Sequence, residues 1–344
     1  MSVITIKDIA KALNLSISTV SKALNDSHDI SKATKNQVLE YAKEKGYRPN
    51  VLAQNLKTGR SNTIGVILSS INNSFYSQVM EGIQQYALSV GYDVIYMQSR
   101  EQPEIEKSCI EALQLRGIDG LLIAPIDETS NYQLLKKLHM ENFPVVIFDR
   151  ILHKLETLKI GVDNSKGAYL ATQHLIKIGR TKILNITGSK FGLSGERFNG
   201  YKQALLDANI PFVPNYYIQC NMQNQTLLDQ DLQISISNIM QSEFKPNAIL
   251  SSSDTISVRI LGILAELGYK VPEDLAVIGF SNVDFPNSLN PSLSTIRQPA
   301  SEIGRLATEK LIQFIKKKNW LQLEPKNIEL EIELTYRKST AIPN

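Results

Sequence analysis

Apolar residues in the first part of the chain recur at helical spacing. The first such stripe consists of Ile6, Ile9, Ala10 and Leu13, at i, i+3, i+4 and i+7. Thr5 followed by Asp8 has the pattern of a capping box at the start of this helix. Polar residues from Asn14 then break the stripe. The pattern predicts a short helix that begins just after Thr5.

Two further helices follow the same logic. In the second, Val20 and Leu24 turn inward, and the outward face carries Ile17, Ser18, Ser21 and Lys22. Asn25-Asp26-Ser27 ends this helix. Ser31 caps a third helix of about fourteen residues, and Gly46 stands at the C′ position expected for a helix stop.

Two short helices joined by a tight turn, followed by a third, form the helix-turn-helix plan. The second helix would enter the major groove of DNA, and its outward residues are small or basic, as groove entry requires. Lys22 can reach guanine acceptors or a phosphate. The alternative is a three-helix bundle that makes protein contacts.

A two-turn amphipathic segment follows this bundle. Asn50 can cap a helix over VLAQNLKT, which runs to Gly59. An isolated helix of this length is unstable in water, yet Leu52 and Leu56 share one of its faces. The segment therefore needs a partner, which is either another molecule or the chain's own core.

From Thr63 onward, apolar runs of strand length alternate with helical stripes. In chain order the runs are TIGVILS, YDVIYM, DGLLIAP, PVVIFD, KIGVD, KILNIT, NAILSS and LAVIGF. Such alternation predicts parallel sheets built from βαβ units. We expect two similar lobes, each a doubly wound sheet, with the second series starting at KIGVD.

Doubly wound sheets bind ligands beyond the carboxyl ends of their strands, and unusual residues gather at those ends here. Asp149 can accept hydrogen bonds from sugar hydroxyls, Arg197 can donate in a fork, and Phe75 and Tyr76 offer ring faces. These groups suit a polyhydroxylated ligand. Each has a structural alternative, because Asp149 can cap a turn, Arg197 can pair with a surface carboxylate, and either ring can belong to the core.

Composition and charge narrow the class of protein. The 344 residues are 42% hydrophobic and 21% charged, as in ordinary globular proteins, and the net charge is +3. Residues 1–60 hold 10 Lys and Arg against 5 Asp and Glu, whereas the remainder holds 27 against 29. A basic N-terminal module indicates a nucleic-acid contact or, alternatively, an ordinary solvated helical segment.

The N-terminus lacks the pattern of a signal peptide and no apolar run is long enough to span a bilayer, so we expect a cytoplasmic protein with no membrane partner. Cys109 and Cys220 are far apart in the sequence and match no metal spacing, which predicts free thiols. Enzyme motifs are also missing from the sequence, since it holds no G-x-G pair, Gly-Lys pair, G-x-S-x-G or H-E-x-x-H. We therefore expect no enzyme, metal or cofactor.

Several motifs together resemble the lac repressor family of bacterial transcription regulators. They are TIKDIAKALNLSISTVSKALND and GYRPNVLAQNL near the N-terminus, then VDNSKGAYLATQHLIKIGRTKI, ERFNGY, LSSSD, VPEDLAVIGFSN and LSTIRQP. The resemblance covers residues 5 to 337. It implies a helix-turn-helix domain at 1–48, a hinge helix and linker at 49–61, and an effector-binding and dimerisation domain at 62–344 that is similar to periplasmic sugar-binding proteins.

The resemblance also implies site residues. On the DNA side they are Thr5, Ile17, Ser18, Thr19, Ser21, Lys22, Asn25, Tyr47, Asn50, Ala53 and Leu56. Leu56 stands where the family pushes a leucine into the minor groove. On the effector side they are Asn73, Phe75, Tyr76, Asp149, Arg197, Met222, Ser253, Asp254, Ser281 and Asn282. Met222 can instead be packing, and Ser281 stands where the family often has an aspartate, so the identity of the effector stays open.

Family architecture further implies three crossings between the lobes, near residues 160, 291 and 321. Lobe 1 would hold about 62–160 and 292–321, and lobe 2 about 161–291 and 322–344. The tail lacks the leucine heptads of a tetramerising coiled coil, which favours a dimer. The sequence thus predicts a homodimeric repressor of carbohydrate-use genes that binds a palindromic operator and a sugar or sugar derivative. A purine effector stays open.

Overall fold

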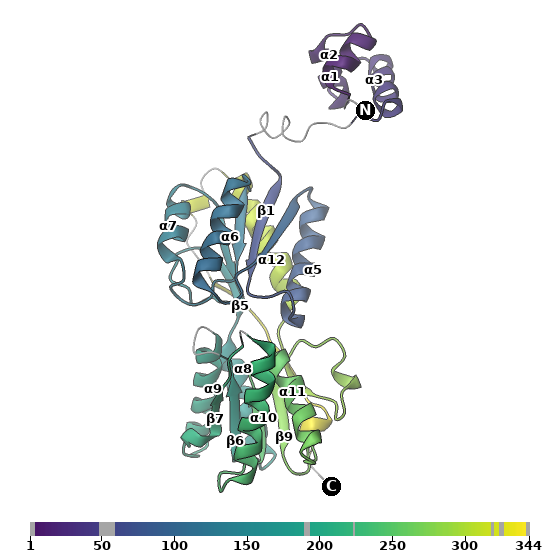
Figure 1. The fold of residues 1–344 in the computed structure, drawn as a ribbon. Helices are drawn as coiled ribbons and strands as arrows, with labels where there is room; N and C mark the ends of the chain where they lie inside the picture. Colours follow the sequence, from purple (N-terminus) through teal and green to yellow (C-terminus); the bar gives the residue numbers. More distant parts are fainter. Residues whose placement is uncertain are drawn as a thin grey trace. The chain divides into compact units, whose positions relative to one another are not determined.

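The computed structural model describes residues 4–47, 59–188, 193–222, 224–317, 320–322 and 327–341. Two compact units make up the chain, Met1–Ser61 and Asn62–Asn344 (Figure 1). Each unit has a hydrophobic core of its own. The two units are therefore described separately.

The N-terminal unit, the headpiece, holds α1 (Ile6–Ala12), α2 (Ile17–Leu24) and α3 (Lys32–Glu44). Each helix begins at a hydroxyl side chain that accepts a backbone N–H, from Thr5, Ser16 and Ser31 respectively. The capping box between Thr5 and Asp8 is present, as the sequence predicts. Ile9, Val20 and Val38 lie fully buried where the three helices meet. The headpiece therefore has the three predicted helices.

The second unit contains two six-stranded sheets. The first has the order β11-β5-β4-β3-β1-β2 and is parallel throughout. Its strands are β1 (Thr63–Leu68), β2 (Asp93–Gln98), β3 (Gly120–Ile123), β4 (Val145–Phe148), β5 (Lys159–Val162) and β11 (Asn327–Leu330). Helices α5 (Ser74–Ser89) and α12 (Ala300–Lys316) share a core with one face of this sheet, and α6 (Pro103–Leu115) and α7 (Tyr132–Met140) share a core with the other.

The second sheet has the order β12-β10-β9-β8-β6-β7. Its strands are β6 (Ile183–Thr187), β7 (Tyr217–Gln219), β8 (Ala248–Ser251), β9 (Ala276–Phe280), β10 (Ser294–Arg297) and β12 (Glu333–Thr335). Helices α8 (Asn164–Lys177) and α9 (Leu193–Asp207) cover one face, and α10 (Gln225–Gln241) and α11 (Asp254–Glu266) cover the other. Short 3-10 turns complete the unit at Pro214–Tyr216, Pro286–Ser288, Trp320–Gln322 and Lys338–Thr340.

The predicted doubly wound plan is confirmed, with all eight expected strands present. The lobe boundaries differ from expectation. Strand β5, expected to open the second series, pairs with β4 in the first sheet. Strand β11, expected in the second lobe, pairs with β5 in the first. Strand β10 lies within residues 292–321, which were expected in the first lobe, but it pairs with β9 in the second sheet.

The chain consequently passes between the lobes directly after β5, after β10 and between β11 and β12. Sequence patterns could not locate these points, because a strand that ends one sheet looks the same as a strand that begins another. The pairing partner of each strand shows which sheet, and so which lobe, the strand belongs to. The three crossings bring the carboxyl ends of the two sheets toward one another.

Two helix pairs pack with glycine at the contact. A Cβ on Gly82 of α5 would lie 1.9 Å from the backbone oxygen of Ser301 at the start of α12. A Cβ on Gly304 of α12 would lie 2.1 Å from the oxygen of Val79 in α5. The second lobe repeats the arrangement, since a Cβ on Gly200 would lie 2.0 Å from the oxygen of Ser165. These helix backbones therefore approach too closely for any side chain.

We predict that Gly82→Ala destabilises the protein, because α5 and α12 must separate to admit the methyl group. Overpacking of this kind costs roughly 1–3 kcal/mol. Gly262→Ala is the matched control, since Gly262 lies in α11 with nothing within 4 Å of its Cβ position. There the helix propensity of alanine should add about 0.5–1 kcal/mol. Urea unfolding measures both, and equal stability of Gly82→Ala and wild type would contradict the proposed contact.

Candidate functional site

The outward face of α2 carries the residues predicted to contact DNA. Ile17, Ser18, Lys22 and Asn25 are exposed, and Ser21 is half-buried. The Lys22 ammonium pairs with Asp29 at 3.0 Å, with both side chains about half exposed. Because an exposed pair of this kind contributes little to stability, a phosphate or a base edge can replace Asp29 as the partner of Lys22.

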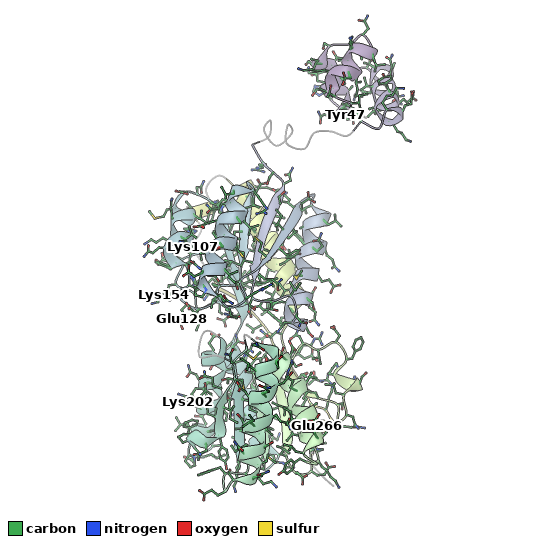
Figure 2. The ribbon with its side chains drawn as sticks, in the orientation of Figure 1. Tyr47, Lys107, Glu128, Lys154, Lys202 and Glu266 are labelled. Carbon is green, nitrogen blue, oxygen red and sulfur yellow. The ribbon has the colours of Figure 1, made fainter. Side chains whose placement is uncertain are left out.

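The other predicted DNA-side residues divide into three groups. Thr5 and Thr19 are engaged at helix starts, Thr5 in the capping box and Thr19 by accepting from or donating to Ser16 at 2.8 Å. Tyr47 is half-buried against the headpiece core, so its ring also has a packing role (Figure 2). Asn50, Ala53 and Leu56 lie outside the described residues.

All ten residues predicted for the effector site line one cavity of about 220 Å³ between the two lobes. They come from the ends of strands and the starts of helices in both sheets. Its described lining consists of Ser69, Ser70, Asn72, Asn73, Phe75, Tyr76, Glu101, Asp149, Arg150, Gly188, Arg197, Met222, Leu228, Ser252, Ser253, Asp254, Thr255, Phe280, Ser281, Asn282 and Gln298. The structure therefore brings the predicted effector residues together.

Asp149 follows β4 and is almost fully buried, at 1% exposure. Its backbone has a φ of 65°, in the left-handed region that few residues other than glycine adopt. Its Oδ2 accepts a hydrogen bond from the Tyr76 hydroxyl at 2.8 Å, and its Oδ1 has no partner. Burial raises the pKa of Asp149, while Arg150, Tyr76 and Arg197 act in the opposite direction. A buried acceptor without a partner indicates a site for a ligand donor.

Arg197, in α9, is buried and its side chain lines the cavity. Its guanidinium carbon lies 3.8 Å from the centroid of the Phe280 ring. Its Nε donates to Asn164 at 2.9 Å, its Nη2 to Gln298 at 3.2 Å, and its Nη1 to the backbone oxygen of Ser252. Burial lowers the pKa of Arg197 to about 10, so the side chain stays charged near neutral pH. The Phe280 ring and the three hydrogen-bond acceptors together fix the position and orientation of the guanidinium group.

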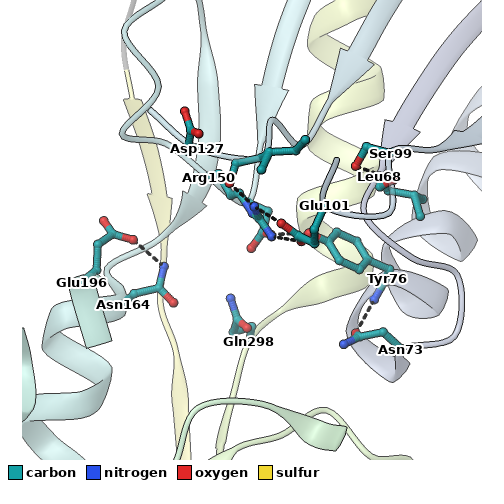
Figure 3. A network of polar contacts seen from close by, with 12 residues as sticks. Leu68, Asn73, Tyr76, Ser99, Glu101, Asp127, Arg150, Asn164, Glu196 and Gln298 are labelled. Atoms are coloured by element: carbon teal, nitrogen blue, oxygen red, sulfur yellow. Dashed lines mark hydrogen bonds and ion pairs between the residues drawn. The ribbon is translucent and has the colours of Figure 1, made fainter. Parts of the chain in front are cut away.

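Glu101 and Arg150 form an ion pair in the cavity wall that the sequence analysis missed (Figure 3). Arg150 Nη1 donates to one Glu101 oxygen at 3.0 Å, and Nη2 donates to the other. Arg150 directly follows Asp149, one of the predicted effector residues. Glu101 follows strand β2 by three residues, and only its place in the sheet, at a strand end, pointed to the cavity.

Several predicted effector residues use their polar atoms to join the lobes. Asn282 donates from its side chain to Gln78 of α5 and to the Gln298 backbone oxygen, both at 2.8 Å, and accepts from the Gln298 backbone at 3.0 Å. Asp254 accepts the backbone N–H of Asn282 and that of Phe75 at the start of α5. Burial raises the pKa of Asp254, and these hydrogen bonds act against it.

Helix capping occupies two others. Asn73 accepts from the Tyr76 backbone at 3.2 Å, and Ser253 accepts from Ile256 at 3.4 Å. Among the described lining residues, the side-chain atoms that are buried without a partner are Asp149 Oδ1, Arg150 Nε and Gln298 Nε2. Gln298 lies directly after β10, a strand that the sequence analysis did not predict. Arg150 Nε lies 3.9 Å from Asp149 Oδ2 in an ion pair, so the acceptor Asp149 Oδ1 and the donor Gln298 Nε2 are the atoms left for a ligand.

Comparisons with known proteins agree with this architecture. Residues 5–50 match the family described as bacterial regulatory proteins, lacI family, and residues 172–340 match the periplasmic binding protein-like domain. The HTH-type transcriptional repressor PurR of Aliivibrio salmonicida is 32% identical over 338 residues, which cover 97% of this chain and 98% of that protein. The ribose operon repressor of Haemophilus influenzae is 32% identical over 326 residues, covering 93% of this chain and 96% of that protein.

The chain belongs to the lacI family of bacterial regulatory proteins.

Solved structures show the same fold. The lac repressor dimer bound to operator and the anti-inducer ONPF has a TM-score of 0.86 at 23% identity, covering 98% of this chain and 99% of that one. The complex of the transcriptional regulator CelR with cellobiose has a TM-score of 0.70 at 24% identity, covering 98% and 99%. As a member of this family the protein is a DNA-binding transcriptional repressor and not an enzyme.

Two further findings concern the rest of the described chain. Both cysteines, Cys109 and Cys220, are free, as predicted, and both are buried. In the described ranges, none of the helices combines the length and the apolar character that crossing a membrane requires.

Glu196 lies beside Arg197 at the rim of this network. Its Oε2 accepts from the Asn164 side chain at 3.2 Å (Figure 3). Asn164 thereby contacts both neighbours, because its Oδ1 accepts from Arg197. Burial raises the pKa of Glu196 from 4.5 to about 7, although Arg197 acts against the shift.

We predict that Glu196 makes stability depend on pH. Its raised pKa means that the folded state binds the proton more tightly than the unfolded state, so its contribution to stability falls as pH rises from about 4.5 to about 7. The difference in unfolding free energy between wild type and Glu196→Gln should therefore decline over this window and level off above it. Chemical unfolding at a series of pH values measures it, with exposed Glu104→Gln as the control. A flat difference would refute the prediction.

Proposed function

We propose that this repressor controls genes for carbohydrate use, with a sugar or sugar derivative in the cavity between its lobes as effector. The proposal includes a homodimer, a palindromic operator and a cytoplasmic location. One observation carries the effector proposal. The buried Asp149 Oδ1 has no hydrogen-bond partner, and it belongs to the same cavity as the Arg197 guanidinium, which stacks on the Phe280 ring. A carboxylate acceptor and a guanidinium donor suit hydroxyl groups, which both donate and accept.

Aromatic rings give further support. Phe75, Tyr76 and Phe280 all line the cavity, and flat apolar surfaces beside polar groups favour a ring that is apolar on its faces and polar at its edges. The named relatives include a ribose operon repressor, and a related fold has been solved with cellobiose. Both names concern those proteins and favour a carbohydrate here.

A purine is the second candidate effector. Relatives named as the repressor PurR match at a similar identity. The same aromatic rings could also stack on a nucleobase, and Asp149 could accept from a ring N–H. Both candidates use the same cavity, so a direct binding test separates them.

The test is a thermal-unfolding screen with D-ribose, D-glucose, cellobiose, hypoxanthine and guanine. A ligand at 100-fold over its Kd stabilises the folded state by about 2.7 kcal/mol. Operator binding is then measured with and without each ligand that stabilises the protein. A shift with a sugar that also changes operator affinity supports the proposal, and a response to the purines alone would replace the sugar with a purine.

We predict that Asp149→Asn weakens binding of the stabilising ligand at least tenfold, because an amide has one acceptor oxygen instead of two and its neutral oxygen accepts more weakly than a carboxylate. The variant should still bind operator, with the ligand-dependent change in operator affinity lost. Asp127→Asn is the control, since Asp127 follows the neighbouring strand but does not line the cavity. Isothermal titration calorimetry gives the ligand affinity, and an unchanged affinity in Asp149→Asn would exclude Asp149 from the site.

We also predict that Lys22→Ala relaxes base preference at one or two operator positions, by about 1–3 kcal/mol each. Lys22 lies on the exposed face of α2 and its partner Asp29 is itself half exposed. Lys43→Ala, on α3, has the same charge change and serves as the control. Binding to a panel of single-base operator variants measures the effect. Uniform weakening on every sequence would make Lys22 a phosphate contact instead.

The hinge residues Asn50, Ala53 and Leu56 complete the proposed DNA surface. They lie outside the described residues, so their support is the sequence resemblance alone. Leu56 stays the proposed minor-groove wedge.

A further inference from the structure

We propose that the cavity selects an uncharged ligand and rejects phosphorylated ones, and that Glu101 determines this specificity by occupying the guanidinium of Arg150. The inference rests on the proposed function only in taking this cavity as the effector site. It holds equally for a free sugar, a nucleobase or a nucleoside, and it excludes sugar phosphates and nucleotides.

The first step concerns the charges that line the cavity. Among the described lining residues, the acids are Glu101, Asp149 and Asp254, and the bases are Arg150 and Arg197. Carboxylates thus outnumber guanidinium groups in a wall that is largely shielded from water. A ligand that brings two further negative charges would be repelled there, since charges interact more strongly in a low-dielectric site.

The second step concerns Arg150, whose side chain is only 13% exposed. Both of its terminal nitrogens point at the Glu101 carboxylate, one at 3.0 Å, and Nη1 also donates to the backbone oxygen of Ile126. This two-point geometry is the one in which arginine recognises a carboxylate or a phosphate. Glu101 therefore occupies the face of Arg150 that would otherwise receive a phosphate.

The third step concerns Arg197, the other cation. Its hydrogen-bond partners Asn164, Gln298 and Ser252 are all neutral, so its charge is balanced by acids that act at longer range. Asp149 is the strongest of these, ahead of Glu196 and Asp254. A phosphate directed at Arg197 would therefore also meet Asp149, whose Oδ1 has no donor of its own.

The fourth step concerns the atoms left for a ligand. Asp149 Oδ1 needs a donor and Gln298 Nε2 needs an acceptor, whereas Arg150 Nε is ion-paired with Asp149 Oδ2 at 3.9 Å. Asp149 and Gln298 both line the cavity. Neighbouring hydroxyl groups, or the N–H and ring nitrogen of a base, meet both needs at once. The doubly ionised phosphate group of an ester offers only acceptors, so it supplies no donor to Asp149 Oδ1.

The first test uses wild-type protein with matched pairs of ligands. The pairs are D-ribose with D-ribose 5-phosphate, D-glucose with D-glucose 6-phosphate, and guanosine with guanosine 5′-monophosphate, measured by calorimetry at constant ionic strength. In any pair that binds, the neutral member should bind at least tenfold more tightly. A phosphate ester that binds as tightly as its neutral partner, or more tightly, overturns the proposal.

The second test uses inorganic phosphate as the probe and needs no identified effector. Glu101→Gln should gain phosphate binding, seen as a rise in Tm over a chloride control of equal ionic strength, whereas wild type should show none. Glu104→Gln is the matched control, because it changes net charge equally from an exposed position outside the cavity. The Arg150→Gln/Glu101→Gln double variant should lose the gain.

These outcomes separate the inference from the proposed function. Phosphate binding to wild type, or its absence in a folded Glu101→Gln, overturns the role of Glu101. Failure of every sugar and purine to bind wild type would instead refute the proposed effectors, and the phosphate test would still decide the role of Glu101. If Glu101→Gln does not fold, the matched pairs on wild type decide whether the cavity rejects phosphate.

Discussion

The buried guanidinium of Arg197 organises the cleft. A cation removed from water needs acceptors, and it keeps its charge here because a ring face and three acceptors surround it. Asn164 begins α8 two residues after the end of β5, and Gln298 follows β10 directly. Both strands end where the chain passes from one lobe to the other. A ligand that bonds to Arg197 therefore acts on a group whose partners lie at two of the three crossings.

A second set of contacts joins the lobes through the start of α5. Asp254 accepts the Phe75 backbone N–H there, and a carboxylate at a helix N-terminus is favoured by the helix dipole. One turn along, Gln78 donates to the Asn282 backbone oxygen at 2.9 Å and accepts from its side chain. Helix α5 in turn packs on α12 without intervening side chains at Gly82. Lobe position and the packing of α5 are thus linked by direct contacts.

Much of the fold and of the candidate site follows from the sequence, and the exceptions share a cause. Helix starts at Thr5 and Ser31 were predictable because capping depends on neighbouring residues. Asp149 and Arg197 were identifiable because apolar strands and helix stripes point to sheet ends. The lobe assignment of β5 and β11 was not, since it depends on pairing between strands more than 160 residues apart.

The same distinction applies within the cavity. Asn282 was identified as a lining residue, yet local sequence could not show that its amide is engaged by Gln78, 204 positions away. Glu101 was missed because a polar residue after a strand has no special pattern until Arg150 is placed opposite. The type of a residue and its place in the sheet can therefore be predicted from the sequence. Which of its polar atoms have hydrogen-bond partners is known only from the folded structure.

The headpiece and the body each fold around a separate core, which constrains how an effector can act. A ligand changes operator affinity only if it interacts differently with two arrangements of the protein. The lobe-bridging hydrogen bonds at Asp254 and Asn282 are contacts that a change of lobe position would alter. By linkage, operator DNA must change effector affinity by the same factor as effector changes operator affinity.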